Sequence, residues 1–169
     1  MARYVEMAIG SPSRRGTLVP YDDMWDIVYE AGQTQAIYRS VYIYDEEGLD
    51  FVQKNKTVKS FLGTRHIDEI PIGNYQCFFS GTGYHIMLAG DNFNFKADNE
   101  LPYVVKQTML QAFPNFKLDP SVYSRTAIIR MAHTLNIKSQ LFKVPISRDE
   151  LMNGTYPDIQ KLAQTRRTA

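Results

Sequence analysis

Cysteine is nearly lacking from the 169-residue sequence, which contains only Cys77. One thiol excludes an internal disulfide and a zinc site built from several cysteines, so we expect a reducing compartment. No apolar run approaches the roughly 18 residues that a membrane-spanning helix needs, and residues 1–10 lack the apolar core of a signal peptide. We therefore expect a cytoplasmic protein or one of an intracellular viral replication complex.

Neither sign of charge is in excess, since Lys and Arg total 19, Asp and Glu total 18, and the net charge is +1. Bulk charge therefore neither demands nor excludes a polyanionic partner, and only local clusters of cations can argue for nucleic acid. The sequence also lacks internal repeats and low-complexity tracts. A hydrophobic fraction of 44% over this length is enough for one core, so we expect a single domain over residues 1–169.

Hydrophobic periodicity predicts both helices and strands. Helical spacing of apolar residues covers 21–31 and 101–113, two helical turns are expected at 49–56, and Ser147 with Glu150 has the spacing of a capping box. Runs rich in β-branched and aromatic residues predict strands at 36–44, 77–79, 86–88, 127–130 and 141–146, short strands within 57–72, and a turn at 134–140. Residues 1–20 indicate a short apolar opening and a basic loop. The pattern predicts an α+β fold, in which a mixed β-sheet carries the site and helices cover its back.

A glycine turn stands between the two central strands. Gly81 and Gly83 allow the backbone to approach a ligand closely and tolerate positive φ, while Ser80 offers a hydroxyl and His85 a ring nitrogen. Successive backbone N–H groups in such a turn can hold an anion, and a histidine can add a proton-bearing donor. The same pattern also occurs in ordinary hairpin turns, so the residues alone leave both interpretations open.

A second group of polar residues lies in the C-terminal half. Asp119 follows a leucine, Arg130 ends a predicted strand, and Lys138 and Lys143 follow within the next 13 residues. Phosphoryl transfer uses carboxylates to hold divalent metal, and cations with backbone N–H groups to hold a triphosphate. These residues together with the glycine turn are therefore the set expected in one cleft.

The order of these motifs resembles the archaeo-eukaryotic primase superfamily, which includes the small catalytic subunit of primase and viral primase-polymerases. Residues 79–86, Phe-Ser-Gly-Thr-Gly-Tyr-His-Ile, are similar to the family's second motif, which binds the phosphates of the incoming nucleotide. Residues 117–123 and the stretch from Ile128 to Ile146 resemble the third motif and the nucleotide-binding strand after it. The resemblance extends over about 70 residues, which makes it more specific than a single glycine turn.

The resemblance implies a role for each matching residue. Asp119 would bind metal and Arg130 would contact the triphosphate. Asn136, Lys138 and Lys143 stand where the family places nucleotide or template contacts. Ser80, Gly81, Gly83 and His85 would complete the nucleotide site.

The family's first motif, a pair of acids at the end of a strand, has more than one candidate. Asp45 and Glu47 have the Asp-x-Glu pattern after a predicted strand, and would join Asp119 to bind Mg²⁺ or Mn²⁺. The alignment that viral members suggest places the acids after residues 70–72 instead, where this chain has Gly73 and Asn74 and no room for the family's helix. Residues 68–69, Asp-Glu, are a third candidate.

Two functions follow from these alternatives. With both acids present, the chain is expected to be a DNA primase or primase-polymerase core that transfers nucleotides from nucleoside triphosphates, directed by a single-stranded DNA template and assisted by two divalent metals. Without them, it is expected to be a catalytically inactive primase-like subunit that binds nucleotide or nucleic acid. The resemblance favours the enzyme, and it leaves room for a helicase or an accessory primase subunit as a partner.

Overall fold

The computed structural model describes residues 2–46, 49, 75–88, 93, 95, 98, 100–124 and 126–167. Helices and antiparallel sheets are both present, which confirms the α+β class. The sequence predictions for 49–56 and 57–72 fall almost wholly outside the described residues. The single domain over 1–169 stays a prediction. No described helix has the length and apolarity needed to cross a membrane.

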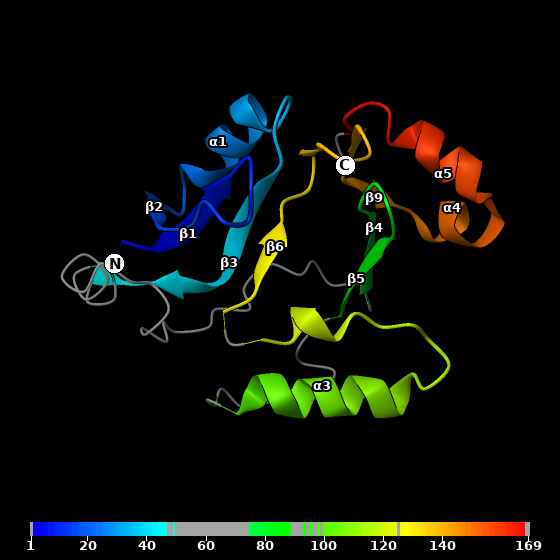
Figure 1. Cartoon of the computed structure of the whole chain (residues 1–169), viewed down its shortest axis with the longest axis horizontal. Coiled ribbons are helices and arrows are strands. Elements are labelled where there is room, and N and C mark those ends of the chain that lie inside the picture. Colours follow the sequence, from blue (N-terminus) through cyan, green and yellow to red (C-terminus); the bar gives the residue numbers. More distant parts are fainter. Residues whose placement is uncertain are drawn as a thin grey trace.

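The first half of the fold is a four-stranded sheet in the order β2-β1-β3-β6 (Figure 1). Its strands are β1 (Tyr4–Ile9), β2 (Thr17–Pro20), β3 (Ile37–Tyr44) and β6 (Ile128–Arg130). Helix α1 (Met24–Ala31) packs against this sheet and buries Met24 and Val28 in a core that also contains Met7, Ile37 and Met131. Apolar residues of α1 therefore recur at helical spacing because one face of the helix covers the sheet.

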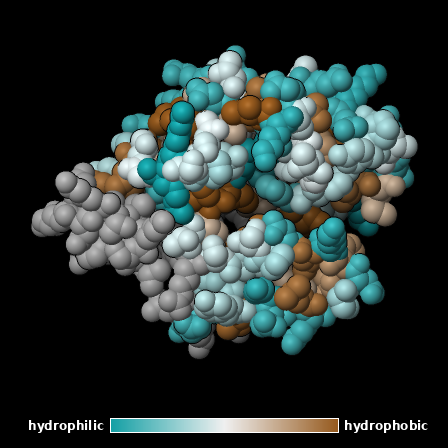
Figure 2. Space-filling model, viewed as in Figure 1, coloured by the Kyte–Doolittle hydropathy of each residue, from teal (hydrophilic) through white to brown (hydrophobic). Residues whose placement is uncertain are grey.

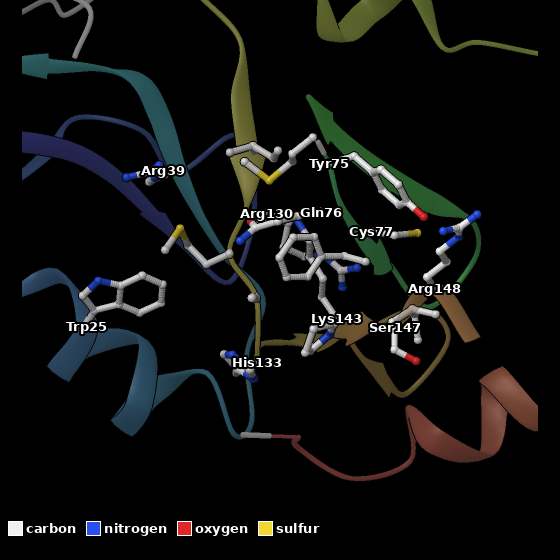
Figure 3. Close-up of a pocket in the computed structure, with 17 residues that line it drawn as sticks. Trp25, Arg39, Tyr75, Gln76, Cys77, Arg130, His133, Lys143, Ser147 and Arg148 are labelled. Carbon is white, nitrogen blue, oxygen red and sulfur yellow. The ribbon is translucent and has the colours of Figure 1, made fainter. Parts of the chain in front are cut away.

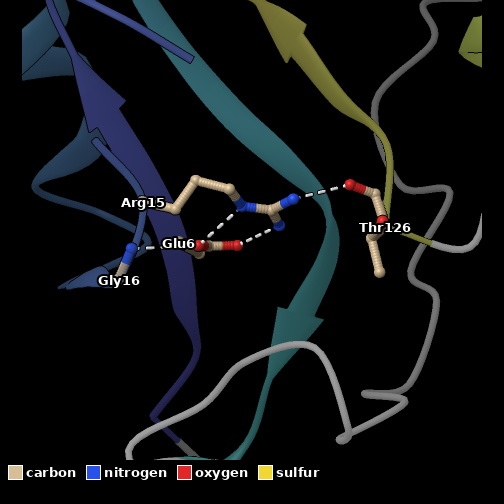
Figure 4. A network of polar contacts seen from close by, with 4 residues as sticks. All are labelled: Glu6, Arg15, Gly16 and Thr126. Carbon is tan, nitrogen blue, oxygen red and sulfur yellow. Dashed lines mark hydrogen bonds and ion pairs between the residues drawn. The ribbon is translucent and has the colours of Figure 1, made fainter. Parts of the chain in front are cut away.

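The short apolar opening expected at the start of the chain is strand β1, and the basic segment 11–16 is the loop that joins it to β2, as the sequence predicts. Glu6 interrupts the apolar run of β1, yet only 1% of its surface is exposed, because Arg15 neutralises it. The guanidinium donates from Nε to Glu6 Oε1 (3.0 Å) and from Nη2 to Oε2 (2.5 Å), and Nη1 donates to Thr126 O (2.8 Å) (Figure 4). A buried charge whose partner lies nine residues away has no signature in hydrophobic periodicity.

The second half is a three-stranded sheet in the order β5-β4-β9. Strands β4 (Tyr75–Phe79) and β5 (Tyr84–Leu88) form a hairpin, and β9 (Val144–Ile146) pairs with the other edge of β4. Helices α4 (Arg148–Asn153) and α5 (Tyr156–Leu162) follow β9. A second core forms from residues of β4, β9 and α5, namely Cys77, Phe79, Val144, Ile146, Ile159 and Ala163.

Both C-terminal helices begin with a capping box, in which the side chain of the first residue and that of the third helical residue bond each other's backbone N–H. Ser147 and Glu150 form the box of α4, as the sequence predicts. Thr155 and Asp158 form the equivalent box of α5. Each box satisfies N–H groups that the first helical turn leaves without partners.

The strand predicted at 141–146 is divided in two by Lys143. Strand β8 (Leu141–Phe142) pairs with β7 (Leu135–Asn136) in a separate two-stranded sheet, whereas β9 pairs with β4. At the division, Lys143 exchanges backbone hydrogen bonds with His133 (2.7 Å) and Thr134 (3.0 Å). The strand therefore changes partners at this residue, and one continuous ladder does not form.

Every strand pair in the described chain is antiparallel, and the strands form three sheets rather than the single mixed sheet expected. Short connections explain part of this result, since a hairpin such as β4-β5 or β7-β8 can only be antiparallel, whereas a parallel pair needs a long crossover. Helix α3 (Leu101–Ala112) and the 3₁₀ helix η2 (Pro120–Val122) lie beyond the end of β5 (Figure 1).

The two halves meet along β6, β7 and the C-terminal arm, residues 163–167. In the arm, Arg166 donates to the carbonyls of Val28 (2.9 Å) and Tyr29 (2.7 Å) at the end of α1. Arg167 donates to Pro145 O (3.3 Å) and to Glu150 (2.8 Å) beside α4. The arm therefore joins both halves. On the face shown in Figure 2, hydrophobic residues gather in the hollow between them.

Candidate phosphate-binding site

The glycine turn joins β4 to β5 and packs directly against the β7–β8 hairpin. Ser80 N donates to Gly83 O (2.7 Å), and Gly81 has φ +90°, a conformation that favours glycine. A Cβ atom at Gly81 would stand 2.5 Å from Ser139 Oγ and 3.1 Å from Asn136 Nδ2. Gly81 is therefore required by its backbone conformation and by this contact, which brings two distant parts of the sequence together.

Arg130 reaches the turn from the end of β6. Its Nη2 donates to the carbonyl of Ser80, which also accepts from Asn136 Nδ2 at 3.2 Å. Ser80 thus binds these two residues through its backbone rather than its hydroxyl. Arg130 is 7% exposed, and burial lowers the pKa of its side chain. Its Nη1 is buried and has no hydrogen-bond partner in the described part of the chain, so one charged donor is unsatisfied.

Lys143 is buried next to Arg130, with 2% of its surface exposed. Its Nζ donates to Arg130 O at 2.7 Å and lies 5.1 Å from the centre of the Phe78 ring. Burial, and then the charges of Arg130 and Arg39, lower the pKa of Lys143 to about 7. The ammonium is therefore only about half protonated at neutral pH, and a nearby anion would favour its charged form.

His85 stands opposite Phe78 in the β4–β5 ladder, so the two side chains share one face of the hairpin. Burial lowers the pKa of His85 to about 4, and the charges of Lys143 and Arg130 act in the same direction. The imidazole is neutral at pH 7 and carries one N–H. Its Nδ1 is buried without a hydrogen-bond partner among the described residues. His85 is thus placed with the two cations, as the sequence predicts.

Asp119 contributes a negative charge at the border of the site. Its exposed side chain caps η2, where the carboxylate accepts from Ser121 N at 2.9 Å. The hydrogen bonds to Ser121 lower the pKa of Asp119, and the electrostatic attraction to His85 adds to this effect. The fold therefore brings Asp119 within electrostatic range of His85, although 33 residues separate them in sequence.

The β7–β8 hairpin closes the other side of the glycine turn. Asn136 Oδ1 accepts from Lys138 N (3.0 Å), which fixes the amide so that Nδ2 points to Ser80. Lys138 itself is exposed. Sequence reasoning missed Ser139, whose Oγ is buried without a hydrogen-bond partner among the described residues. The only available signal was its position in a hairpin turn that follows Asn136.

Of the candidate acids of the first motif, Asp45 is the only one within the described residues, and its role as a metal ligand stays a prediction. Asp45 follows β3, and the β3 residue that pairs with Arg130 is Tyr38. Seven residues of extended chain separate Tyr38 from Asp45, which corresponds to roughly 20 Å. Glu47 lies outside the described residues, as do the alternatives at 68–69. Within the described ranges, no group of three or more His, Cys, Asp or Glu residues is arranged to hold a metal ion.

The donor set fits an anion better than a pair of divalent metals. Three buried polar atoms that lack a partner in the described part of the chain come from the residues that surround the glycine turn, namely Arg130 Nη1, His85 Nδ1 and Ser139 Oγ. Two metals about 3.5–4 Å apart need several carboxylates, and Asp119 is the only predicted metal ligand that the described structure brings near His85. Comparisons of the chain with protein-family models, curated proteins and solved structures found no match.

Proposed function

We propose that this chain is a primase-like domain that binds the phosphates of a nucleoside triphosphate between the glycine turn and Arg130. The observation that carries the proposal is a set of three buried polar atoms around one turn, those of Arg130, His85 and Ser139, which have no hydrogen-bond partner among the residues that the structure describes. Buried polar groups are nearly always hydrogen-bonded, so such a set indicates a ligand with several acceptor oxygens. A phosphate has these oxygens and the negative charge that buried cations favour.

Electrostatics support the same ligand. Arg130 and Lys143 are both buried, and burial lowers the pKa of each because their charges lack enough solvation. A phosphate would supply the missing counter-charge in a region of low dielectric constant, where the attraction is strong. Neutral His85 and Asn136 add neutral donors. The exposed Lys138 would attract the outer part of the triphosphate.

A binding experiment tests this proposal. We expect nucleoside triphosphate and inorganic tripolyphosphate to compete for one site in calorimetric titrations. Arg130→Lys, which keeps the charge but loses the fork of donors, should weaken both ligands about tenfold or more, since a charge-assisted hydrogen bond contributes about 1.5–3 kcal/mol. His85→Ala should weaken them about fivefold. Lys161→Gln, which removes an exposed charge on α5, is the matched control.

Thermal melting of each variant would separate lost binding from lost structure, because Arg130 also holds Ser80. If the Arg130→Lys and His85→Ala variants are folded and bind both ligands as tightly as the wild type, the proposed phosphate site is wrong.

A second candidate is template-directed nucleotidyl transfer, for which the position of Asp119 near His85 is the supporting observation. In the related enzymes that the sequence resembles, bound Mg²⁺ or Mn²⁺ stabilises charge on the transferred phosphoryl group. Among the described residues, Asp119 is the carboxylate that interacts with His85, and one carboxylate does not fit two metals, so we derive no step through them. The sequence offers further acids at Asp45, Glu47, Asp68 and Glu69.

Primer synthesis or extension with Mn²⁺ on single-stranded DNA tests this second candidate. Asp119→Asn should abolish nucleotide incorporation while leaving the fold intact, because the carboxylate is exposed. Equal incorporation by wild type and Asp119→Asn would leave the inactive, nucleotide-binding subunit as the better proposal. For either role we propose an intracellular replication complex as the setting, with a helicase or an accessory primase subunit as a partner.

A further inference from the structure

A cleft of about 750 Å³ lies between α1 and β6 on one side and β4 and β9 on the other (Figure 3). Its lining is mainly apolar and includes Phe78, Met131 and Pro145. Lys143, which precedes β9, lines the cleft, although only 2% of its surface is exposed. The amine of Lys143 therefore lies against an apolar space, in which its charged form is poorly solvated.

The surroundings of this amine offer little to a cation. An ammonium group has three N–H donors, and among the described residues Lys143 makes one side-chain hydrogen bond, to Arg130 O at 2.7 Å. The centre of the Phe78 ring lies 5.1 Å from Nζ. No aspartate or glutamate is among the described residues that line the cleft. These surroundings favour the neutral amine, in agreement with the lowered pKa of Lys143.

Two arginines lie near the same amine. Arg130 and Arg39 both line the cleft, and the charges of both lower the pKa of Lys143 (Figure 3). Arg130 Nη1 is buried and has no hydrogen-bond partner in the described part of the chain. Positive charges that disfavour an ammonium favour an anion at the same position. The cleft therefore has the charge and a free donor for a small anionic group on Lys143 itself.

We propose that Lys143 is a carbamylation site, at which its amine reacts reversibly with carbon dioxide. The nitrogen lone pair forms a bond to the carbon of CO₂, one C=O electron pair becomes the negative charge of a carboxylate, and the proton lost by nitrogen passes to solvent. The resulting lysine carbamate accepts a hydrogen bond from Arg130 Nη1 and is attracted by Arg39. CO₂ is small and uncharged, so it suits a buried amine that larger electrophiles do not reach.

Carbamylation would regulate the proposed phosphate site. It replaces a group that can carry a positive charge with one that carries a negative charge, and the carbamate competes with phosphate for Arg130. If about nine-tenths of the chains carry the carbamate, tripolyphosphate should bind about tenfold more weakly, because only the remaining fraction is competent. The modification itself is independent of the proposed function, and only this consequence rests on it.

Nuclear magnetic resonance with ¹³C-labelled bicarbonate tests the modification. In protein whose lysine side-chain nitrogens carry ¹⁵N, we expect a carbamate carbon resonance that is split by its bond to nitrogen. The N-terminal amine, which has a pKa of about 7.7–8.0 in peptides and also reacts, carries no such label. Lys143→Arg should lose the split resonance, whereas Lys161→Gln, which removes an exposed amine on α5, should keep it.

Trapping of the wild-type protein makes the test independent of any variant that fails to fold. Ethylation of the carbamate by triethyloxonium, followed by peptide mass spectrometry, should place the added group on Lys143. Calorimetric titration with tripolyphosphate, in CO₂-free buffer and in bicarbonate, then measures the competition.

Two results would overturn the inference. One is a wild-type protein that shows neither a split resonance nor a trapped group on Lys143 in saturating bicarbonate, and the other is a split resonance that persists in folded Lys143→Arg. Carbamate formation with an unchanged affinity for tripolyphosphate would refute the regulatory consequence. A chain that forms the carbamate but binds no tripolyphosphate in CO₂-free buffer would support the modification and refute the proposed function.

Discussion

Phosphate binding should tighten about tenfold as the pH falls from 8 to 6, because the site contains a buried lysine that titrates near neutrality. The pKa of Lys143 is lowered to about 7. Its protonated fraction is therefore about 0.9 at pH 6 and about 0.1 at pH 8. If only the ammonium form attracts the anion, the apparent affinity changes in the same ratio.

Charged and titratable groups near Lys143 could also contribute to the pH dependence of phosphate binding. The charges of Arg130 and Arg39 lower the pKa of Lys143, and His85, with its pKa of about 4, stays neutral above pH 5. The ligand also titrates, since a terminal phosphate gains a proton near pH 6. Lys143→Arg removes this ambiguity, because arginine stays charged at every pH tested and leaves only the ligand's own titration.

Calorimetric titration with tripolyphosphate at pH 6, 7 and 8 would measure the effect. The wild type should lose about tenfold more affinity than Lys143→Arg between pH 6 and 8. Lys143→Met should bind weakly at all three values and show no further loss. Parallel pH profiles for wild type and Lys143→Arg would refute the reasoning.

Stability gives a second readout of the same group that does not require a ligand. Unfolded lysine has a pKa near 10.4, so between about pH 7 and 10.4 the unfolded chain holds a proton that the folded chain has lost. The free energy of unfolding should therefore rise with pH in this window, by at most about 1.4 kcal/mol per pH unit. Urea denaturation should show this rise in the wild type and not in Lys143→Met.

Three further substitutions test the structure around the site. Gly81→Ala should lower the free energy of unfolding by about 2 kcal/mol, because Gly81 has a positive φ and the new methyl group would clash with Ser139. Gly83→Ala should change the free energy of unfolding by less than about 0.5 kcal/mol, because no described atom lies within 4 Å of the new methyl group. Denaturation of both variants side by side checks this difference. Glu6→Gln should cost about 3 kcal/mol in the same assay, since it leaves Arg15 without its buried counter-charge, and a cost near zero would show that the ion pair is dispensable. Arg166→Gln should cost about 1–3 kcal/mol and speed hydrogen exchange at the end of α1, and unchanged exchange there would contradict the contacts of the C-terminal arm.

Local signals in the sequence predicted several elements close to their observed bounds. The strand expected at 36–44 is β3, and the strand expected at 127–130 is β6. The helix expected at 101–113 is α3, which ends one residue earlier. The capping box predicted at Ser147 is present. Each of these depends on neighbours within a few residues, which is the range over which periodicity and capping act.

Elements that depend on distant partners were not predictable in the same way. Strand β1 contains a buried glutamate that is tolerated only because Arg15 folds back onto it. Lys143 divides a strand because backbone groups of residues 133–134 replace the ladder. In both cases a polar contact between separate segments outweighs the local pattern.

For the site, the sequence predicted the meeting of the glycine turn, Arg130 and Lys143, because their motif order resembles a known family. The structure adds contacts that a sequence motif does not specify. The carbonyl of Ser80 is the group that Arg130 and Asn136 share, and Ser139 supports Gly81. Asp45 has the right spacing for a metal ligand, and it follows β3, seven residues beyond the Tyr38 that pairs with Arg130, so its role as a metal ligand stays a prediction.

The C-terminal arm has a mechanical consequence for the cleft that lies between α1 and β6 on one side and β4 and β9 on the other. Arg166 holds the end of α1, which carries one wall, and Arg167 holds the strand and helix of the other wall. Any ligand that moves the two walls apart must lengthen or break these hydrogen bonds. The contacts of the arm therefore limit how wide the cleft can open. Cutting the chain before residue 166 should therefore leave two intact cores joined by a looser hinge.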